Sequence, residues 1–329
     1  MNPGLAALSH FVCLECGDPL TTRTQGSGGG KALLCPRCGS AWPFVGGIPR
    51  FVGADNYADS FGHQWNIHRR TQLDSHTGLP LSRSRLFGVT RWPEDLRGQS
   101  ILEAGSGAGR FTEILVRTGA RVFSFDSSAA VEANFANNGA ASNLCLFQGD
   151  ISRIPLPPAS FDKVLCLGVL QHTPDPRAAF QSLAACVKPG GELVVDIYAK
   201  RITAILSWKY VLRPLTKRAD HRRLYRLVER AVDILLPVAR RARRVGGRVG
   251  ARLLPIVEYS HLGLPEALNR DWAVLDTFDM YAPEHDHPQT LQAVRGWYRD
   301  LGWVDVEVSP GPNGVIGRGR RPVAGDVSA

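Results

Sequence analysis

The sequence predicts a chain of the α/β class, in which a parallel sheet carries helices on both faces and a small cysteine-rich module precedes it. Four of the seven cysteines stand in two C-x2-C pairs within the first 38 residues. From Gln99 onward, short apolar runs alternate with helical patterns, which is typical of strand–helix–strand units and a parallel sheet. A glycine-rich turn, Gly105-Ser-Gly-Ala-Gly109, follows the first of these runs.

The overall composition is that of a folded, globular chain. Of the 329 residues, 44% are hydrophobic and 21% are charged, which excludes a disordered protein, a collagen and a coiled coil. The length fits one enzyme-sized domain with a small appendage. No run of about 18 apolar residues occurs, and Met1–Leu5 lack the basic region of a signal peptide. We therefore expect a cytoplasmic protein without a membrane span, attached at most peripherally to the inner membrane surface.

The cysteine-rich module, residues 1–54, has the spacing of a zinc site. Its four candidate ligands are Cys13, Cys16, Cys35 and Cys38. Each C-x2-C pair forms a knuckle that aims two thiolates at one point, and Gly17 and Gly39 follow where a knuckle must turn. Four thiolates complete the shell of a structural Zn²⁺, with unpaired cytosolic thiols as the alternative. We expect chelation to unfold this module and to spare the rest of the chain.

Two further features of the cysteines and glycines concern packing rather than chemistry. Gln25–Gly30 is rich in glycine and predicts a loose hairpin tip between the two knuckles. Cys145, Cys166 and Cys186 lie in or near apolar runs and are expected in the core.

Five strands are expected in the large domain. They are Ser100–Ala104, Arg121–Asp126, Leu144–Gln148, Phe161–Gly168 and, after a turn at Lys188–Gly191, Gly191–Tyr198. A helix over about residues 110–117 follows the glycine turn. Glycines there let the backbone approach a ligand at the helix N-terminus, and Asp126 ends the second strand where an acid binds ribose hydroxyls. Because ligands of such sheets bind outside the carboxyl ends of the strands, the site is expected there.

With these residues the chain resembles the class I S-adenosylmethionine-dependent methyltransferases, in particular the small-molecule branch that includes the ubiquinone and menaquinone methyltransferases. The resemblance runs from about Gly98 to Arg320, apart from one insertion, and includes the segments Val169–Pro176 and Val187–Glu192. It implies a Rossmann-like seven-stranded sheet that ends in an antiparallel hairpin, with S-adenosylmethionine as the methyl donor. The cofactor-binding residues that it implies are Glu103, Gly105, Ser106, Gly107, Gly109, Asp126, Ser127, Asp150, Ile151 and Gly168.

The resemblance extends to the front of the chain. Trp42-Pro43 and Gly47-Ile48-Pro49 are similar to the closing strand of zinc ribbons of the methyltransferase-activator type. Such ribbons also precede some ribosomal-RNA methyltransferases. A nicotinamide dehydrogenase is the rival interpretation of the glycine turn, but it has Gly-x-Gly-x-x-Gly spacing and lacks the Asp150-Ile151 pair.

Three segments are candidates for the acceptor side of the site. His172 follows the fourth strand and is the candidate base, with a loop-supporting role as the alternative. Phe61–Trp65 resembles the N-terminal lid helix of these enzymes, with a linker helix as the alternative. Asp276–His287 is polar and aromatic and is interpreted as a solvated loop rather than a second metal site.

The net charge of +9 comes from one segment. Residues 200–255 hold 16 Lys and Arg against 3 Asp and Glu, whereas the rest of the chain holds 23 against 27. The segment is predicted to be helical, with its apolar residues at i, i+3, i+4 spacing. These are Leu224, Leu227, Val228, Ala231 and Leu235. Three roles stay open: a cap with solvated arginines, docking to an anionic membrane, and RNA binding.

We therefore predict an S-adenosylmethionine-dependent methyltransferase for O- or C-methylation of a small-molecule or lipid-linked acceptor. An RNA methyltransferase that binds nucleic acid with its ribbon and basic cap is the alternative, and a non-catalytic cofactor-binding protein is a third. The expected division is a zinc ribbon (1–54), a linker with lid helices (55–98), the cofactor-binding half of the core (99–199), a basic helical cap (200–270), the C-terminal part of the core (271–322) and a disordered tail (323–329).

Overall fold

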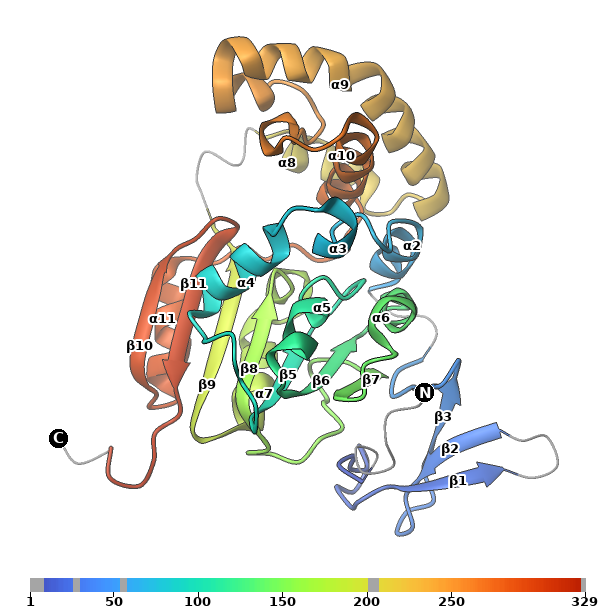
Figure 1. Cartoon of the computed structure of the whole chain (residues 1–329), viewed down its shortest axis with the longest axis vertical. Coiled ribbons are helices and arrows are strands. Elements are labelled where there is room, and N and C mark those ends of the chain that lie inside the picture. The colour runs from blue at the N-terminus through green and yellow to red at the C-terminus, as the bar shows by residue number, and fades with distance from the viewer. Residues whose placement is uncertain (1–8, 26–29, 54–57, 201–206, 327–329) are drawn as a thin grey trace.

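A computed structural model describes residues 9–25, 30–53, 58–200 and 207–326 (Figure 1). Predictions for Met1–Leu5, for the glycine-rich tip at residues 26–29 and for the last three residues of the tail fall outside these ranges. Within the tail, the Asp326 carboxylate accepts hydrogen bonds from Arg320 at 2.8 Å and from the Val323 amide at 3.0 Å.

The centre of the molecule is a seven-stranded sheet. Its strands, in spatial order, are β10 (Val304–Pro310), β11 (Gly314–Arg320), β9 (Val187–Tyr198), β8 (Phe161–Leu167), β5 (Ser100–Ala104), β6 (Arg121–Asp126) and β7 (Leu144–Gln148). The five strands from β9 to β7 are parallel, and β11 is antiparallel to both of its neighbours. This arrangement confirms the predicted fold class, including the C-terminal antiparallel hairpin.

Helices cover both faces of this sheet (Figure 1). On one face lie α4 (Leu81–Thr90), α5 (Thr112–Leu115), which a 3-10 turn extends to Thr118, and α6 (Ala130–Asn138). On the other lie α7 (Pro176–Cys186) and α11 (Leu291–Asp300). Neighbouring strand residues such as Ile101 and Leu102 belong to opposite apolar clusters because successive side chains of a strand alternate. Both faces are buried, so these strands are apolar throughout.

Strand β9 begins earlier than predicted. The turn expected at Lys188–Gly191 does not interrupt it, although its register against β8 shifts there and Gly190 adopts a φ of +79°. The Gly190 amide donates to the Arg321 carbonyl at 2.8 Å, and the Arg321 amide donates to the Gly191 carbonyl at 2.9 Å. These tertiary bonds hold the glycines in line with the strand. Local turn propensity predicted a turn because it does not include such bonds.

The N-terminal module forms a separate small sheet. Its strands are β1 (Thr21–Gln25), β2 (Gly30–Leu34), β3 (Ala41–Val45) and β4 (Ile48–Pro49). The module packs against the β7 edge of the large sheet. Arg50 bridges in parallel to Gln148, and the Phe51 amide donates to the Gln148 carbonyl at 2.9 Å. The Phe11 and Phe147 rings meet edge to face, with centroids 5.2 Å apart. One apolar cluster therefore joins the module to the sheet, in contrast to the independent unit that the cysteine spacing led us to expect.

The inserted segment forms a helical cap over the carboxyl ends of the strands. It comprises α8 (Trp208–Thr216), α9 (His221–Ala251, with non-helical angles at Gly247) and α10 (Glu266–Tyr281). A third apolar cluster joins the inner side of α9 to α10. Helix α10 runs through residue 270, where the predicted cap ends, and residues 201–206 lie outside the described ranges.

The buried stripe of α9 is rotated from the predicted one. Leu224 and Val228 are buried as expected, whereas Leu227 is 62% exposed. Val232, Leu236 and Ala239 complete the buried face instead. None of the helices in the described ranges is both long enough and apolar enough to cross a membrane.

Two short helices lie between the cap and the sheet. They are α2 (Asp59–Ile67), which packs on α6, and α3 (Asp74–Thr77). At the end of α2, the imidazole Nε2 of His68 lies 2.7 Å from the Tyr225 hydroxyl of α9. The cap and α2 are thus joined by a buried polar contact.

Candidate active site

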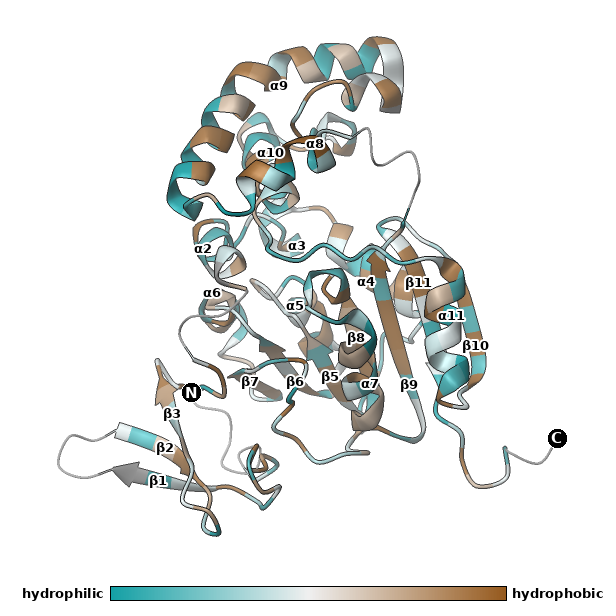
Figure 2. Cartoon of the chain, turned by 180° about the vertical axis from the view of Figure 1, so that it is seen from behind, coloured by the Kyte–Doolittle hydropathy of each residue, from teal (hydrophilic) through white to brown (hydrophobic). Residues whose placement is uncertain are grey.

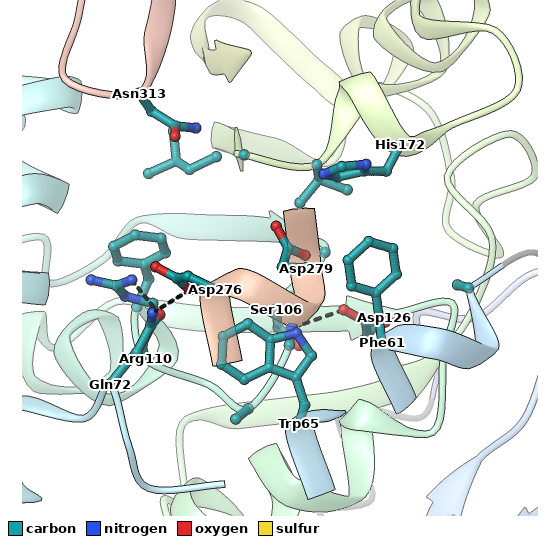
Figure 3. Close-up of a pocket in the computed structure, with 18 of the residues that line it drawn as sticks. Phe61, Trp65, Gln72, Ser106, Arg110, Asp126, His172, Asp276, Asp279 and Asn313 are labelled. Atoms are coloured by element: carbon teal, nitrogen blue, oxygen red, sulfur yellow. Dashed lines mark hydrogen bonds between the residues drawn. The ribbon is translucent and has the colours of Figure 1, made fainter. Parts of the chain in front are cut away.

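A cavity of about 540 Å³ lies between the carboxyl ends of the strands, α2 and the cap (Figure 3). Eight predicted site residues line it, namely Gly105, Ser106, Gly107, Asp126, Ser127, Ile151, Gly168 and His172. Its size is within the range of about 300–1,000 Å³ of small-molecule and cofactor sites. The fold therefore brings most of the predicted residues together around one cavity.

The glycine loop after β5 forms one wall. The Gly105 amide donates to the Phe125 carbonyl at 2.8 Å, and the Gly107 amide donates to Asp126 Oδ2 at 2.8 Å. Gly105 has a φ of +75°, and a Cβ atom there would collide with Val169. Only glycine meets both conditions, so this turn leaves backbone exposed to the cavity.

Asp126 connects this loop to the end of β6. Its Oδ1 accepts from the Ser128 amide at 2.9 Å and from the Ser128 hydroxyl at 2.7 Å. Burial raises the pKa of the Asp126 carboxyl, while the Ser128 and Gly107 bonds oppose this shift. Since each carboxylate oxygen carries two lone pairs and Oδ2, among the described residues, accepts only from Gly107, Oδ2 can accept one further bond from a ligand hydroxyl.

Three predicted cofactor residues lie outside the cavity lining. Gly109 packs against Asn134 of α6, and the Asp150 carboxylate accepts from the Ser152 amide at 2.7 Å. Glu103 lies behind the glycine loop. Its Oε2 accepts from Thr112 at 2.5 Å and from Ser124 at 2.7 Å. Glu103 and Gly109 thus pack behind the glycine loop, and Asp150 bonds its own turn after β7.

Glu103 makes stability depend on pH. Burial raises its pKa from 4.5 to about 7, and its buried Oε1 has no hydrogen-bond partner among the described residues. The folded chain therefore takes up this proton more readily than the unfolded chain, so the stabilisation is complete below pH 4.5 and is lost as pH rises through 7. In the wild type, this proton should make the free energy of unfolding roughly 2–3 kcal/mol higher at pH 5 than at pH 8, and Glu103→Gln should remove that difference. Urea unfolding at pH 5 and pH 8 measures it, and an unchanged difference between the two would contradict the assignment.

Helix α2 covers the glycine loop. Trp65 lies over Gly107, where an added Cβ would come within 3.2 Å of the indole (Figure 3). Asn66 Nδ2 donates to the Ala129 carbonyl at 3.0 Å, which fixes α2 on the start of α6. Phe61 also lines the cavity, so the segment predicted as a lid lies over the site.

The opposite wall comes largely from α10. Asp276 and Asp279 both line the cavity, and the Tyr198 hydroxyl donates to Asp279 at 3.2 Å. Asp276 accepts from the Tyr259 hydroxyl and, at 3.3 Å, from Gln72 Nε2. Burial raises the pKa of Asp276 to about 6. The interpretation of this stretch as a loop was wrong up to Tyr281, because packing of α10 on α9 extends the helix.

The remainder of the predicted loop, residues 282–287, is irregular, with Glu284 and His287 exposed as a solvated loop would have them, but Asp286 turns inward. The Asp286 carboxylate is 3% exposed and pairs with Lys209 at 2.8 Å, and Lys209 itself lines the cavity. The His285 carbonyl lies 3.1 Å from His172 Nδ1. Among the described residues, the only group of four candidate metal ligands is that of the N-terminal cysteines.

His172 lies at the border of the two walls. A carbonyl only accepts, so Nδ1 is the protonated nitrogen and donates to His285, which leaves Nε2 of the neutral ring as an acceptor. Burial lowers the pKa of His172. Its ring contacts Phe61, with centroids 5.1 Å apart, and Tyr198 edge to face at 5.4 Å. The imidazole is thus held in a fixed orientation at the cavity surface.

Sequence reasoning missed several polar residues that line the cavity or support its lining. Arg85 donates to the fully buried Asp196 at 2.7 Å, and Arg110 contacts the Gln72 amide oxygen. Burial lowers the pKa of Arg110 to about 10, so it stays charged at neutral pH. Arg85 stands in a helix with no apolar periodicity that would orient it. The one local signal was Asp196, a charged residue in an otherwise apolar strand.

The four cysteines of the N-terminal module form the second candidate site. Their sulfur atoms all lie within 4.8 Å of one another, and the Cys13–Cys38 and Cys16–Cys35 sulfur pairs are each 3.4 Å apart. A Zn²⁺ ion at about 2.3 Å from four tetrahedral thiolates requires sulfurs about 3.8 Å apart. Gly17 and Gly39 both adopt a φ of +78°, as the knuckle turns require. The donor set therefore fits a closed zinc site.

Comparison with known proteins finds a family and several relatives that resemble the part of the chain around the cavity. A family described as "Methyltransferase domain" matches residues 102–195. The ubiquinone biosynthesis O-methyltransferase of Xylella fastidiosa is 31% identical over 129 residues, which are 37% of this chain and 52% of that protein. The enzyme of the same name from Acinetobacter baylyi is 28% identical over 181 residues, 52% of this chain and 69% of that protein. The chain thus spans about half the length of the first of these relatives.

Among solved structures, one with a similar fold is the complex between the Haloferax volcanii Trm112 methyltransferase activator and a methyltransferase. It aligns with 14% identity and a TM-score of 0.44 over 80% of this chain and 99% of that chain. The family match covers strands β5 to β9 and the glycine loop, so residues 102–195 are similar to a methyltransferase domain over the part of the sheet that lines the cavity.

Proposed function

We propose that this chain is an S-adenosylmethionine-dependent methyltransferase acting on a small-molecule or lipid-linked acceptor. The observation that carries the proposal is the two-sided cavity. A backbone glycine loop with Asp126 forms one wall, and carboxyl, hydroxyl and imidazole groups from the cap and from the ends of β8 and β9 form the other. The curated relatives named above are O-methyltransferases of ubiquinone biosynthesis, which favours O-methylation of a small or lipid-linked acceptor over C-methylation.

The residues of the cofactor wall fit a nucleoside with an amino-acid tail. The bound cofactor would supply an electrophilic methyl group for direct transfer. Asp126 would accept the ribose hydroxyls, and the backbone between Gly105 and Gly107 would accommodate the tail where side chains are excluded. Trp65 and Phe61 would exclude water from above. Positioning of the acceptor in line with the methyl group then supplies much of the rate enhancement.

His172 is the group best placed to remove a proton from an acceptor hydroxyl. Its lowered pKa keeps Nε2 unprotonated at neutral pH, so the rate should rise with pH below 6.5 and level off above it. We expect His172→Gln to reduce kcat about 10²–10⁴-fold, with little change in cofactor affinity, and to remove this limb of the pH profile. A variant that loses activity but retains the limb would leave His172 as a support of the loop alone.

We also propose that the cysteine cluster holds one structural Zn²⁺ and that the chain divides as the sequence predicts, with the cap extended to Tyr281. Support comes from the separate small sheet of residues 21–49 and from the separate apolar cluster of the cap. The fit of the four sulfurs supports the metal. Metal analysis of the purified chain should find zinc close to one ion per chain.

The test of the activity is transfer of a labelled methyl group into fractionated host lysate. Label in the lipid-extractable or small-molecule fraction supports the proposal, whereas label in RNA that ribonuclease removes would favour the RNA alternative. Cofactor binding without any transfer would indicate a non-catalytic protein. For a lipid-linked acceptor, we propose a chain located at the cytoplasmic face of the inner membrane, in peripheral contact with anionic lipid through residues 200–255.

A further inference from the structure

The outer side of α9 carries an apolar stripe that the protein core does not use. Leu227 is 62% exposed, Ile234 71%, Val238 54%, Val245 89% and Val249 74%. Leu227, Ile234, Val238 and Val245 recur every seven and four positions, which places these four on one side of the helix, whereas Val249 follows the non-helical angles at Gly247. The buried stripe of the same helix, from Leu224 to Ala239, faces α10. Figure 2 shows hydrophobic residues alternating with hydrophilic ones along the whole of α9.

Exposed arginines border this stripe. At 100° per residue, Arg223, Arg230 and Arg241 lie directly beside Leu227, Ile234 and Val238, and all three arginines are exposed. Within the described part of the chain, these three arginines form no ion pair, whereas Arg240 and Arg243, on the inner side, pair with Glu266 and Glu258. The inner arginines thus serve the cap, and the outer ones are available to a partner.

The exposed apolar stripe and the arginines beside it together indicate the kind of partner. A second copy of this chain would bring two surfaces of the same strong positive charge together. Nucleic acid would attract the arginines, but it offers nothing to bury a row of Leu, Ile and Val. A bilayer with anionic headgroups offers phosphates at the level of the arginines and acyl chains just beneath, where an amphipathic helix lies in the plane of the membrane.

We propose that α9 docks the chain on an anionic membrane surface by inserting the stripe of Leu227, Ile234, Val238 and Val245 between the headgroups. The inference deepens the proposed peripheral contact and rests on it. On its inner side, α9 packs against α10, which carries Asp276 and Asp279 on the cavity wall. Docking therefore places the cavity wall formed by α10 one helix away from the lipid. An acceptor with an acyl or prenyl tail would have only a short path from the bilayer to the cavity.

The experiment is flotation of the full chain with vesicles of phosphatidylcholine alone and with 30% phosphatidylglycerol added. We expect binding to the anionic vesicles that weakens at high salt. The double variant I234E/V238E should reduce binding at least tenfold, because a carboxylate in the stripe faces both acyl chains and anionic headgroups. Both positions are exposed, so the fold should be retained. Leu301→Glu, an exposed apolar residue after α11 that is 38% exposed, is the matched control.

Three outcomes would overturn the inference. They are a folded chain that ignores anionic vesicles, a double variant that binds them as well as the wild type, and a dimer in sedimentation that I234E/V238E dissociates. Cofactor affinity, measured by calorimetry on the same proteins, keeps the proposed function separate. Vesicle binding without cofactor binding would refute the methyltransferase proposal and leave the docking surface. Cofactor binding without vesicle binding would refute the docking surface and leave the methyltransferase proposal.

Discussion

Replacing Asp126 with alanine is expected to weaken S-adenosylmethionine binding by about 1–3 kcal/mol, the cost of removing a charged hydrogen-bond acceptor from a buried site. The structure gives this carboxylate two roles. Its Oδ2 accepts from the Gly107 amide at 2.8 Å, and this oxygen, in a residue that lines the cavity, has a lone pair left for a ribose hydroxyl. The alanine variant loses both, so affinity should fall between about fivefold and 150-fold.

Isothermal calorimetry on the purified chain measures this effect. Asp126→Asn is the conservative comparison, because an amide oxygen can still accept from Gly107 while the charge is removed. Asp300→Ala removes a surface carboxylate that is paired with Arg177 on the far side of the sheet, and should leave the affinity unchanged. If Asp126→Ala binds the cofactor as tightly as the wild type, the proposed ribose contact is wrong.

Removal of the Zn²⁺ proposed for the cysteine cluster is expected to lower the thermal midpoint of the whole chain by more than about 10 °C, in a single transition. Structural zinc sites contribute several kcal/mol to folding, and about 1 kcal/mol shifts the midpoint of a chain of this size by roughly 2–4 °C. The transition should be shared because Phe11 and Phe51 of the module pack on Phe147 of β7. Arg50, 8% exposed, adds a bond to Gln148 at 2.9 Å.

Calorimetric scans with and without a chelator test this expectation, and Cys35→Ser should reproduce the effect of the chelator. Arg37→Ala is the control within the same knuckle, since Arg37 is 66% exposed and pairs only at the surface with Asp18. Two separate transitions, with the upper one at the midpoint of the metal-loaded chain, would restore the independent module that the cysteine spacing alone indicates.

The sequence alone was sufficient for the parts of the molecule whose physics is local. Ser100–Ala104, Arg121–Asp126 and Leu144–Gln148 are strands with the predicted bounds, because strands buried on both faces are continuous apolar runs between turn residues. The glycine loop and the paired cysteines were also recognisable, since a left-handed turn requires glycine and a knuckle requires fixed ligand spacing.

Only the tertiary structure decided which distant residues share the site. Gln72 bonds both Arg110 and Asp276 at one side of the cavity, although 204 residues separate Gln72 from Asp276 (Figure 3). Leu227 and Val232 show the same limit on a single helix. Both are apolar at helical positions, but packing against α10 buries Val232 and leaves Leu227 to the solvent. Periodicity determines that a helix has apolar sides, whereas the neighbouring elements determine which side is core and which remains a surface for a partner.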